Sequence, residues 1–484
     1  MCCVRHLSRR HESTYNAYQQ DKNQKHKLPA SQPPISDFAN STTGEVSATY
    51  SLGSSRQRAI TDAIINDLVI GCGFPLSMMQ NDHFRHFMSV VDPKYRVPCR
   101  QTLSYSLIPK KVDEKRDNLK EHLASCTSVA LTADIWTDRR CHSFIAVTGH
   151  TFQRGAAESH LLACKPMPGS HTGQNISEEM EAIVDEYDVR QKVKFVVTDN
   201  ASNMLKAMYL FFPTTDDQKQ LAMEDVVDDS DLWNDLEEEE HEASVCDVGR
   251  RLACFCHSLQ LVIRSGLEKT STCRLAFAKV LKLANMCHQS AVFRSAFEDK
   301  FGAGKSVPAT NATRWNSVHH QLKSLLGLDQ AKVADVLRQT SNNNLILTSK
   351  EVNQLTEVVS VLQPFAEATQ LTQGEGVVTI SCVVPVVLAL RKFLGEKSAT
   401  VTHLTGMVEE LRRQLDIRFF HLLQLLDITV PQSASSQSLA FDNNIFIMAA
   451  ALDPKYAYRW LVDHPGTAET KDALRHRCNG MCKL

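Results

Sequence analysis

The spacing of apolar residues divides this chain of 484 residues into a helical start, a strand-rich middle and a long helical remainder. Residues 58–70 place apolar side chains at three- and four-residue steps, which is the period of an amphipathic helix. Helical spacing recurs in three later stretches, 75–91, 100–107 and 112–123. Together these stretches predict a small helical domain over residues 54–124.

After residue 125 the apolar residues follow a strand pattern. Three short runs, at 128–136, 141–152 and 158–166, predict strands, and a polar connection of hairpin length joins the first two. A helix is predicted over 176–187, a buried strand over 193–198 and a second helix over 200–212. The order β-β-β-α-β-α predicts an α/β layer structure, in which a parallel strand extends a three-stranded meander.

The rest of the chain is helical in pattern over residues 250–440, so an all-α block follows the α/β part. Apolar density returns over 443–462, and the final residues read as polar sequence without a clear element. Two polar stretches separate the folded parts. Residues 21–53, rich in Pro, Ser and Thr, are predicted to be a disordered linker, and residues 216–249 a disordered acidic insert.

Charge is distributed unevenly along the chain. The net charge is −2, but residues 224–242 hold eleven carboxylates and no Lys or Arg, so without them the net charge becomes +9. The remainder is basic enough for a polyanion partner. The acidic stretch is predicted to be a solvated loop, with binding of a basic partner or shielding of a DNA surface as alternatives. Apolar runs of membrane-spanning length are absent from the sequence, and the charged start is unlike a secretory signal.

Two carboxylates are the strongest candidates for chemistry. Asp134 lies within the first predicted strand, on the face opposite Leu131 and Ala133, and Asp199 follows the buried strand over 193–198. Strand ends of this kind carry the sites of α/β proteins, and two carboxylates there can hold Mg²⁺ for displacement at phosphate. The alternative for Asp199 is the N-cap of the helix that follows.

Three further groups have both a chemical and a structural interpretation. Cys254 and His257 have the spacing of half a zinc site, but no second half follows, so a buried structural pair is favoured. Arg314 and Trp315 suit phosphate contact and base stacking, whereas a Trp packed between helices is the alternative. His6 and His11 have the spacing of the helical half of a zinc finger, so they would bind zinc only if the finger were completed.

Five segments together carry a family resemblance. They are Leu131-Thr-Ala-Asp-Ile-Trp-Thr137, Val197-Thr-Asp-Asn-Ala-Ser-Asn-Met204, Cys254-Phe-Cys-His-Ser-Leu-Gln-Leu261, Thr313-Arg-Trp-Asn-Ser317 and Ala451-Leu-Asp-Pro-Lys455. Their order and spacing resemble hAT-superfamily transposases, and most of all the domesticated vertebrate members with BED-type zinc fingers. The resemblance covers about residues 60–460.

The resemblance implies an RNase H-like core, in residues 125–215 and 441–484, interrupted by a large helical insertion domain over 250–440. It also implies that residues 54–124 are a small DNA-binding-type helical domain and that residues 1–20 are the end of a BED-type finger containing His6 and His11. Asp134 and Asp199 would be the first two acids of the catalytic triad. Cys254 and His257 would open the insertion domain, and Trp315 would stabilise a flipped base.

The sequence departs from the family pattern near its end. Only Glu469 follows the Leu-Asp-Pro segment as a glutamate, in a context that reads as a loop, so the third catalytic acid is not found. We therefore expect a catalytically inactive, nuclear, DNA-binding or transcription-regulating protein with no membrane partner. The alternatives are an interaction scaffold without DNA affinity and a residual metal-dependent nuclease. The dimerisation region of the family is also expected to be missing, which would weaken its usual homodimer.

Overall fold

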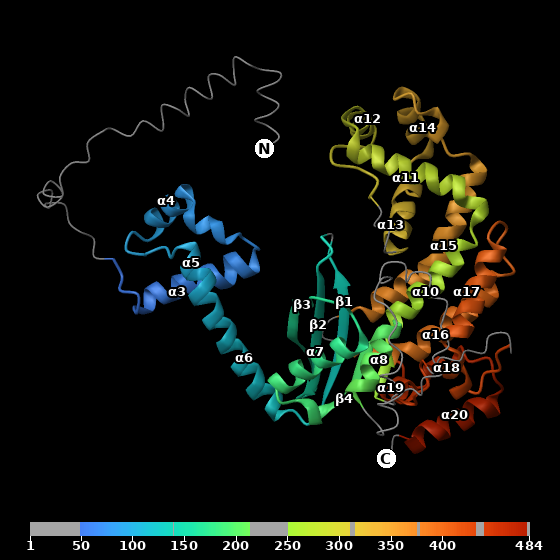
Figure 1. Ribbon diagram of the computed structural model, residues 1–484. Coiled ribbons are helices and arrows are strands. Elements are labelled where there is room, and N and C mark those ends of the chain that lie inside the picture. Colours follow the sequence, from blue (N-terminus) through green and yellow to red (C-terminus); the bar gives the residue numbers. More distant parts are fainter. Residues whose placement is uncertain are drawn as a thin grey trace, which may run out of the picture. The chain divides into compact units, whose positions relative to one another are not determined.

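The computed structural model describes residues 49–138, 140–212, 250–309, 315–374, 378–431 and 440–481 (Figure 1). The chain divides into two compact units, Met1–Asp117 and Asn118–Leu484. The predictions for His6, His11, Arg314 and the acidic insert over 216–249 lie outside the described residues.

The first unit is helical, as the apolar spacing predicted. Polar side chains begin its helices: the Ser54 hydroxyl accepts the N–H of Gln57, and Asn81 accepts the N–H groups of His83 and Phe84. A small apolar core joins these helices around Ile65, Met79 and Leu103. The elements are α3 (Ser55–Ala63), a π-helical segment (Ile64–Gly71), a 3₁₀ turn (Leu76–Gln80), α4 (Asp82–Val91), α5 (Arg100–Thr102), a second π-helical segment (Leu103–Leu107) and α6 (Ile108–Ser125), which continues into the second unit.

A five-stranded sheet begins the second unit, with strand order β3-β2-β1-β4-β5. The strands are β1 (Val129–Thr137), β2 (Ser143–Gln153), β3 (Ala156–Pro166), β4 (Val193–Thr198) and β5 (Arg251–Ala253). The first three form an antiparallel meander, and β4 and β5 add to it in parallel. The RNase H-like order of the first four strands is as predicted. The sequence pattern missed β5, which is too short to show a strand period.

A tight turn fixes the hairpin between β2 and β3. Gln153 pairs with Ala156, which leaves Arg154 and Gly155 as the two turn residues. Both have positive φ, +51° and +80°, as a type I′ turn requires, and the glycine adopts this conformation without steric cost. The turn sets the register of the edge strand β3.

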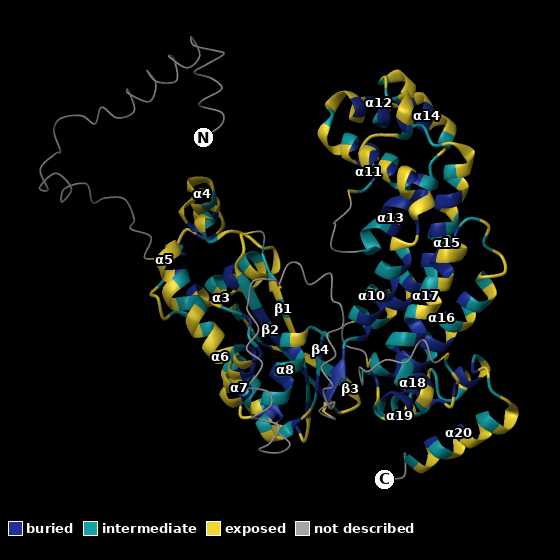
Figure 2. Cartoon of the chain, turned by 45° about the vertical axis from the view of Figure 1, so that its right-hand side comes forward, coloured by how far each residue is buried: buried dark blue, intermediate teal, exposed yellow. Residues whose placement is uncertain are grey.

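The sheet is buried on both faces where β4 lies. Val196 packs into a core with Leu131 and Val147, which is closed by α7 (Gly173–Glu186), α8 (Ser202–Phe211) and the end of α6. Phe195 and Val197 point to the other face and pack against the core of the helical block. Figure 2 shows the dark blue, buried residues running through both layers. A parallel strand between two layers has this two-sided burial.

The helical block follows β5 directly and forms the largest apolar core among the described residues. Its first helix, α10, packs closely on α17, where the backbone of Gly266 meets the side chain of Leu411. Within the described residues, no helix has both the length and the apolar character needed to cross a membrane. The helices are α10 (Phe255–Glu268), α11 (Arg274–Gln289), α12 (Ala291–Phe301), α13 (Trp315–Leu326), α14 (Gln330–Gln339), α15 (Ser349–Thr372), α16 (Val383–Lys397), α17 (Thr405–Arg418), α18 (Phe420–Leu425) and α19 (Ile445–Leu452).

The prediction for the last residues was wrong. They form a helix, α20 (Ala468–Met481), and Glu469 is exposed in its first turn instead of lying in a loop. The hydroxyl of Thr467 accepts the N–H of Thr470 at the start of this helix. Leu474 and Cys478, one turn apart, are buried and anchor it.

Candidate functional site

The carboxyl ends of β1 and β4 bring two of the predicted site residues to the same level. Leu131 pairs with Val196 and Thr132 with Val197 in parallel register. Continuing this register by two residues places Asp134 level with Asp199. Asp134 is exposed, because alternation points it away from the core that holds Leu131 and Ala133, and Asp199 is half-buried.

Strand β5 brings the Cys254–His257 segment to the same edge. Val197 pairs with Leu252, and Thr198 with Ala253. The N–H of Cys254 then donates to the carbonyl oxygen of Thr198 over 2.7 Å. Cys254 is the N-cap residue of α10, so His257 lies in the first turn of that helix, close to the end of the sheet.

The pKa of His257 is influenced by the charges of both acids and of two arginines. Burial is the largest influence and lowers the pKa of its imidazole. The charges of Asp199 and Asp134 act in the opposite direction, and those of Arg418 and Arg251 reinforce the lowering. The two acids, two arginines and His257 therefore share one electrostatic environment at the carboxyl edge of β1, β4 and β5. We call these five residues the edge site.

The thiol of Cys254 is half-buried at the start of α10. Burial raises the pKa of its thiol to about 11, so the thiol stays protonated at neutral pH. Among the described residues, Cys254 and His257 belong to no set of three potential metal ligands, and the buried structural pair stays the prediction for them.

Arg251 supports the backbone around Asp199 and is a site residue that the sequence analysis missed. Its side chain is buried and donates to the Thr198 hydroxyl over 3.1 Å and to the Asp199 carbonyl over 2.6 Å. It also donates to the side-chain oxygen of Asn200. These bonds go to neutral oxygens, so the carboxylate of Asp199 is not tied to Arg251 by them. The only available signal was the basic pair preceding the Cys254 motif.

The two carboxylates offer the oxygen ligands that Mg²⁺ prefers. One oxygen of Asp199 also accepts the N–H of Ala201 over 3.2 Å, but Ala201, not Asp199, is the N-cap residue of α8. Within the described ranges, neither Asp134 nor Asp199 belongs to a set of three ligand residues whose donor atoms lie within 4.8 Å of one another. The carboxylate oxygens of Asp134 and Asp199 fit Mg²⁺, but among the described residues no third ligand joins them.

The two aromatic candidates differ in their surroundings. Trp315, at the start of α13, packs partly against the helical core, with its ring centroid 6.2 Å from that of His319. Trp136, which the sequence analysis did not single out, is two residues beyond Asp134 on the same strand face. It is 40% exposed and stacks on Phe144 of β2, with centroids 5.7 Å apart and rings inclined by 16°.

Comparison with known proteins adds three relatives and one family model. Residues 132–225 match the model of the ZBED1 RNase-like domain. A putative AC transposase of Zea mays is 24% identical over 311 residues, which are 62% of this chain and 35% of that protein. The putative transcriptional regulator tpeD of Talaromyces stipitatus is 24% identical over 318 residues, 59% of this chain and 34% of that protein.

A human relative extends over more of the chain. Zinc finger BED domain-containing protein 4 is 18% identical over 422 residues, which are 83% of this chain and 31% of that protein. The chain therefore spans about a third of the length of the curated relatives that it matches. The matched RNase-like segment contains Asp134 and Asp199, and it ends before β5 and His257.

Proposed function

We propose that this chain, a distant relative of the hAT transposases and of the BED zinc-finger proteins with a ZBED1 RNase-like domain, is a nuclear DNA-binding regulator that does not cut DNA. The observation that carries the proposal is the edge site, where Asp134 and Asp199 lie level beside His257 and two arginines. In α/β proteins the carboxyl ends of parallel strands are where ligands bind.

The surface around the edge site suits nucleic acid. Trp136 presents a partly exposed ring on the Asp134 face, and such rings stack on bases of any sequence. The sequence outside residues 224–242 carries a net charge of +9, which attracts a polyanion. Among the relatives, one is named as a transcriptional regulator and another as a transposase.

The charges of the edge site argue against two-metal cleavage. Such chemistry holds two divalent cations between carboxylates. Here the guanidinium groups of Arg251 and Arg418 act on His257 together with the acid pair. Positive charge this close to the acids would oppose the binding of further cations. A single weakly held Mg²⁺ at Asp134 and Asp199 is compatible with this arrangement, whereas strand transfer is not expected.

The experiment is a titration of the full chain with fluorescent DNA at about 50 and 200 mM salt, with and without Zn²⁺. Contact with six or more phosphates predicts a loss of affinity of about 10³-fold between the two salt concentrations. Zinc-independent, salt-sensitive binding supports the proposal. Binding at neither salt concentration overturns it and favours a scaffold that binds only proteins.

A second assay separates binding from cleavage. Supercoiled plasmid is incubated with the chain and Mg²⁺ or Mn²⁺, and the Asp134→Asn variant serves as the control. The proposal expects no nicking above that of the variant. Metal-dependent nicking that is lost in Asp134→Asn would contradict the inactive part of the proposal and identify a residual nuclease.

A further inference from the structure

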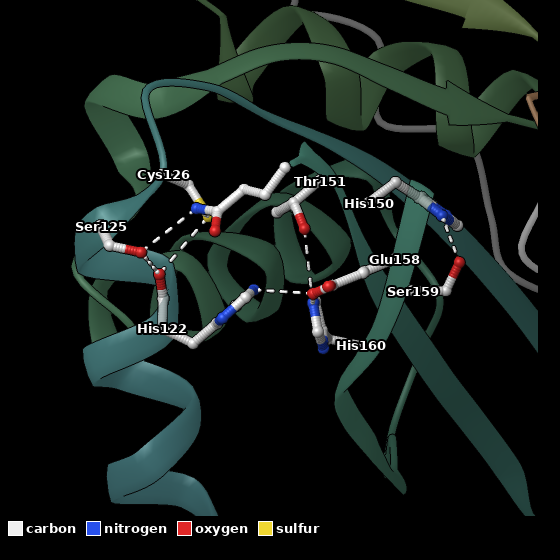
Figure 3. A network of polar contacts seen from close by, with 9 residues as sticks. His122, Ser125, Cys126, His150, Thr151, Glu158, Ser159 and His160 are labelled. Carbon is white, nitrogen blue, oxygen red and sulfur yellow. Dashed lines mark hydrogen bonds and ion pairs between the residues drawn. The ribbon is translucent and has the colours of Figure 1, made fainter. Parts of the chain in front are cut away.

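Three potential metal ligands meet at β3, the outer strand on the side of the sheet away from β5. His122 comes from the last turn of α6, and Glu158 and His160 come from the edge strand β3 (Figure 3). The Nε2 atoms of His122 and His160 lie 3.0 and 3.5 Å from Oε2 of Glu158. One donor atom from each residue lies within 4.8 Å of the other two. We call these residues the β3 cluster.

The backbone presents all three side chains to one another. Glu158 and His160 are two residues apart on β3, so they point to the same face of the sheet. The residue between them, Ser159, points to the other face, where its hydroxyl lies 3.0 Å from Nδ1 of His150. Figure 3 shows His122 approaching from the helix while His150 lies apart from the cluster.

The chain around His122 is held in place by several contacts. The Ser125 hydroxyl donates to the carbonyl oxygen of His122 over 2.6 Å, and the Cys126 thiol donates to the same oxygen. The side-chain amide of Gln153, on β2, donates in turn to Ser125 and Cys126. Leu123, next to His122, is fully buried in the sheet core. The end of α6 is therefore fixed against the sheet.

The β3 cluster is not a fully satisfied ion-pair network. Nε2 of His122 is shielded from solvent and lies 3.0 Å from Oε2 of Glu158, a contact that is an ion pair only when the imidazole is protonated. The imidazoles of His122 and His160 lie with ring centroids 4.8 Å apart and planes inclined by 59°. The side chains of the three residues are between 21% and 40% exposed, so an ion could enter from solvent. One carboxylate oxygen thus lies close to both imidazole nitrogens, and the Thr151 hydroxyl lies 3.4 Å from Nε2 of His160.

We propose that His122, Glu158 and His160 bind a zinc ion, with the fourth position taken by water. Zinc bonds of about 2.0–2.2 Å at tetrahedral angles place ligand atoms roughly 3.3–3.5 Å apart. The two nitrogen-to-oxygen distances to Glu158, 3.0 and 3.5 Å, are close to this value. The ligand nitrogens of His122 and His160 lie within 4.8 Å of each other. To bind one zinc ion, these two nitrogens would have to move closer together.

The ion would join α6 to the edge strand β3. An edge strand has one unpaired side, so a metal bond to the helix restrains it. This site is separate from the edge site, because β3 and β5 are the two outer strands of the sheet. Zinc binding here would stabilise the folded sheet, because ligand that binds only the folded state raises the unfolding temperature.

The test is a Co²⁺ titration of the reduced full chain, followed by displacement with Zn²⁺. The β3 cluster predicts visible absorption bands of tetrahedral cobalt without the near-ultraviolet thiolate band that a cysteine site would add. His160→Ala and Glu158→Gln should each abolish this absorption or lower the affinity for Co²⁺ by at least about 10–100-fold. A change of an outer-shell residue alone lowers metal affinity by that much. His150→Ala, on the other face of the same strands, is the matched control and should leave the signal unchanged.

A thermal measurement completes the test. Zinc should raise the unfolding temperature of the wild type and of His150→Ala, and should raise it less in His122→Gln. Glutamine ranks above histidine in helix propensity, so the last variant should keep the helix, and circular dichroism checks its helicity. Equal stoichiometry and affinity in wild type, His160→Ala and Glu158→Gln would overturn the proposal. So would a cobalt signal that disappears only when cysteines are alkylated.

Discussion

Asp134 is brought level with Asp199 by the parallel register of β1 and β4, although the two residues are far apart in the sequence. The strand face on which Asp134 lies is opposite the apolar core, so its carboxylate stays at the surface. His257 and Arg251 reach the same edge through β5. The acid pair therefore depends on pairing between β1 and β4 alone, whereas the complete edge site also needs the pairing of β4 with β5 across residues 213–249.

The pKa of His257 reports directly on this arrangement. Asp134→Asn removes a charge that raises the pKa, so the pKa should fall further. Arg418→Gln removes a charge that lowers it, so the pKa should rise. NMR titration of ¹³C-labelled histidine in buffer with EDTA measures both shifts. Shifts of the same sign in the two variants would contradict the shared environment.

Trp136 should contribute to DNA affinity if bases stack at the edge site. Trp136→Ala removes a partly exposed ring and should weaken single-stranded DNA binding by about 1–3 kcal/mol, or roughly 5- to 150-fold. Phe152→Ala removes an exposed ring at the opposite end of β2 and is the matched control. Fluorescence anisotropy compares the three proteins, and equal affinities would place the DNA surface elsewhere.

Gly266 should tolerate no side chain. A Cβ there would lie 2.5 Å from Cδ2 of the buried Leu411. Overpacking of about 1–3 kcal/mol exceeds the gain of about 0.5–1 kcal/mol from replacing a helical glycine, so Gly266→Ala should lower the free energy of unfolding by about 1–2 kcal/mol. Gly395→Ala in α16 meets only Arg412, at 3.8 Å, and should be neutral or stabilising. Urea denaturation distinguishes them, and a Gly266→Ala protein as stable as the wild type would refute the close packing of α10 on α17.

Glu351 should make the helical block sensitive to acid. Burial alone would raise its pKa, but hydrogen bonds from Lys279 and from the capping box with Thr348 outweigh burial and lower it. Because the folded pKa lies below the unfolded one, the stabilisation is complete above the unfolded pKa and is lost as pH falls through the folded pKa.

Glu351→Gln tests this charge while keeping the cap, since glutamine also forms capping boxes. The variant should lose about 1 kcal/mol at pH 7, and its difference from the wild type should shrink as the pH falls below about 4. Denaturation midpoints across the pH range measure it. A difference that stays constant with pH would mean that the ion pair with Lys279 contributes nothing.

Sequence periodicity was sufficient for the four longer strands and for most helices, because their apolar residues recur at clear steps. It also placed Asp134 and Asp199 at the carboxyl ends of neighbouring strands, and the parallel pairing of β1 with β4 agrees with that placement. It failed for β5, a three-residue strand after a charged stretch, and Arg251 was missed with it. It also failed for α20, where polar composition concealed the buried pair Leu474 and Cys478.

The remaining residues depend on tertiary contacts that no spacing contains. Trp136 stacks on Phe144 from the neighbouring strand, so its role follows from register. His122 meets Glu158 and His160 only because the end of α6 is fixed against the sheet. Arg314, His6 and His11 lie outside the described residues, and their roles stay predictions.

The three-residue strand β5 has a consequence for the order of assembly during synthesis. A ribosome releases β1 to β4 first, and the sheet then lacks its last strand until residue 253 has emerged. Until that point, Asp134 and Asp199 stand without Arg251 and His257 beside them. Severing the peptide chain between residues 212 and 250 would leave two fragments, which would have to rebuild the edge site through the pairing of β4 with β5, the hydrogen bonds of Arg251 and Cys254, and the packing of Phe195 and Val197 on the helical core.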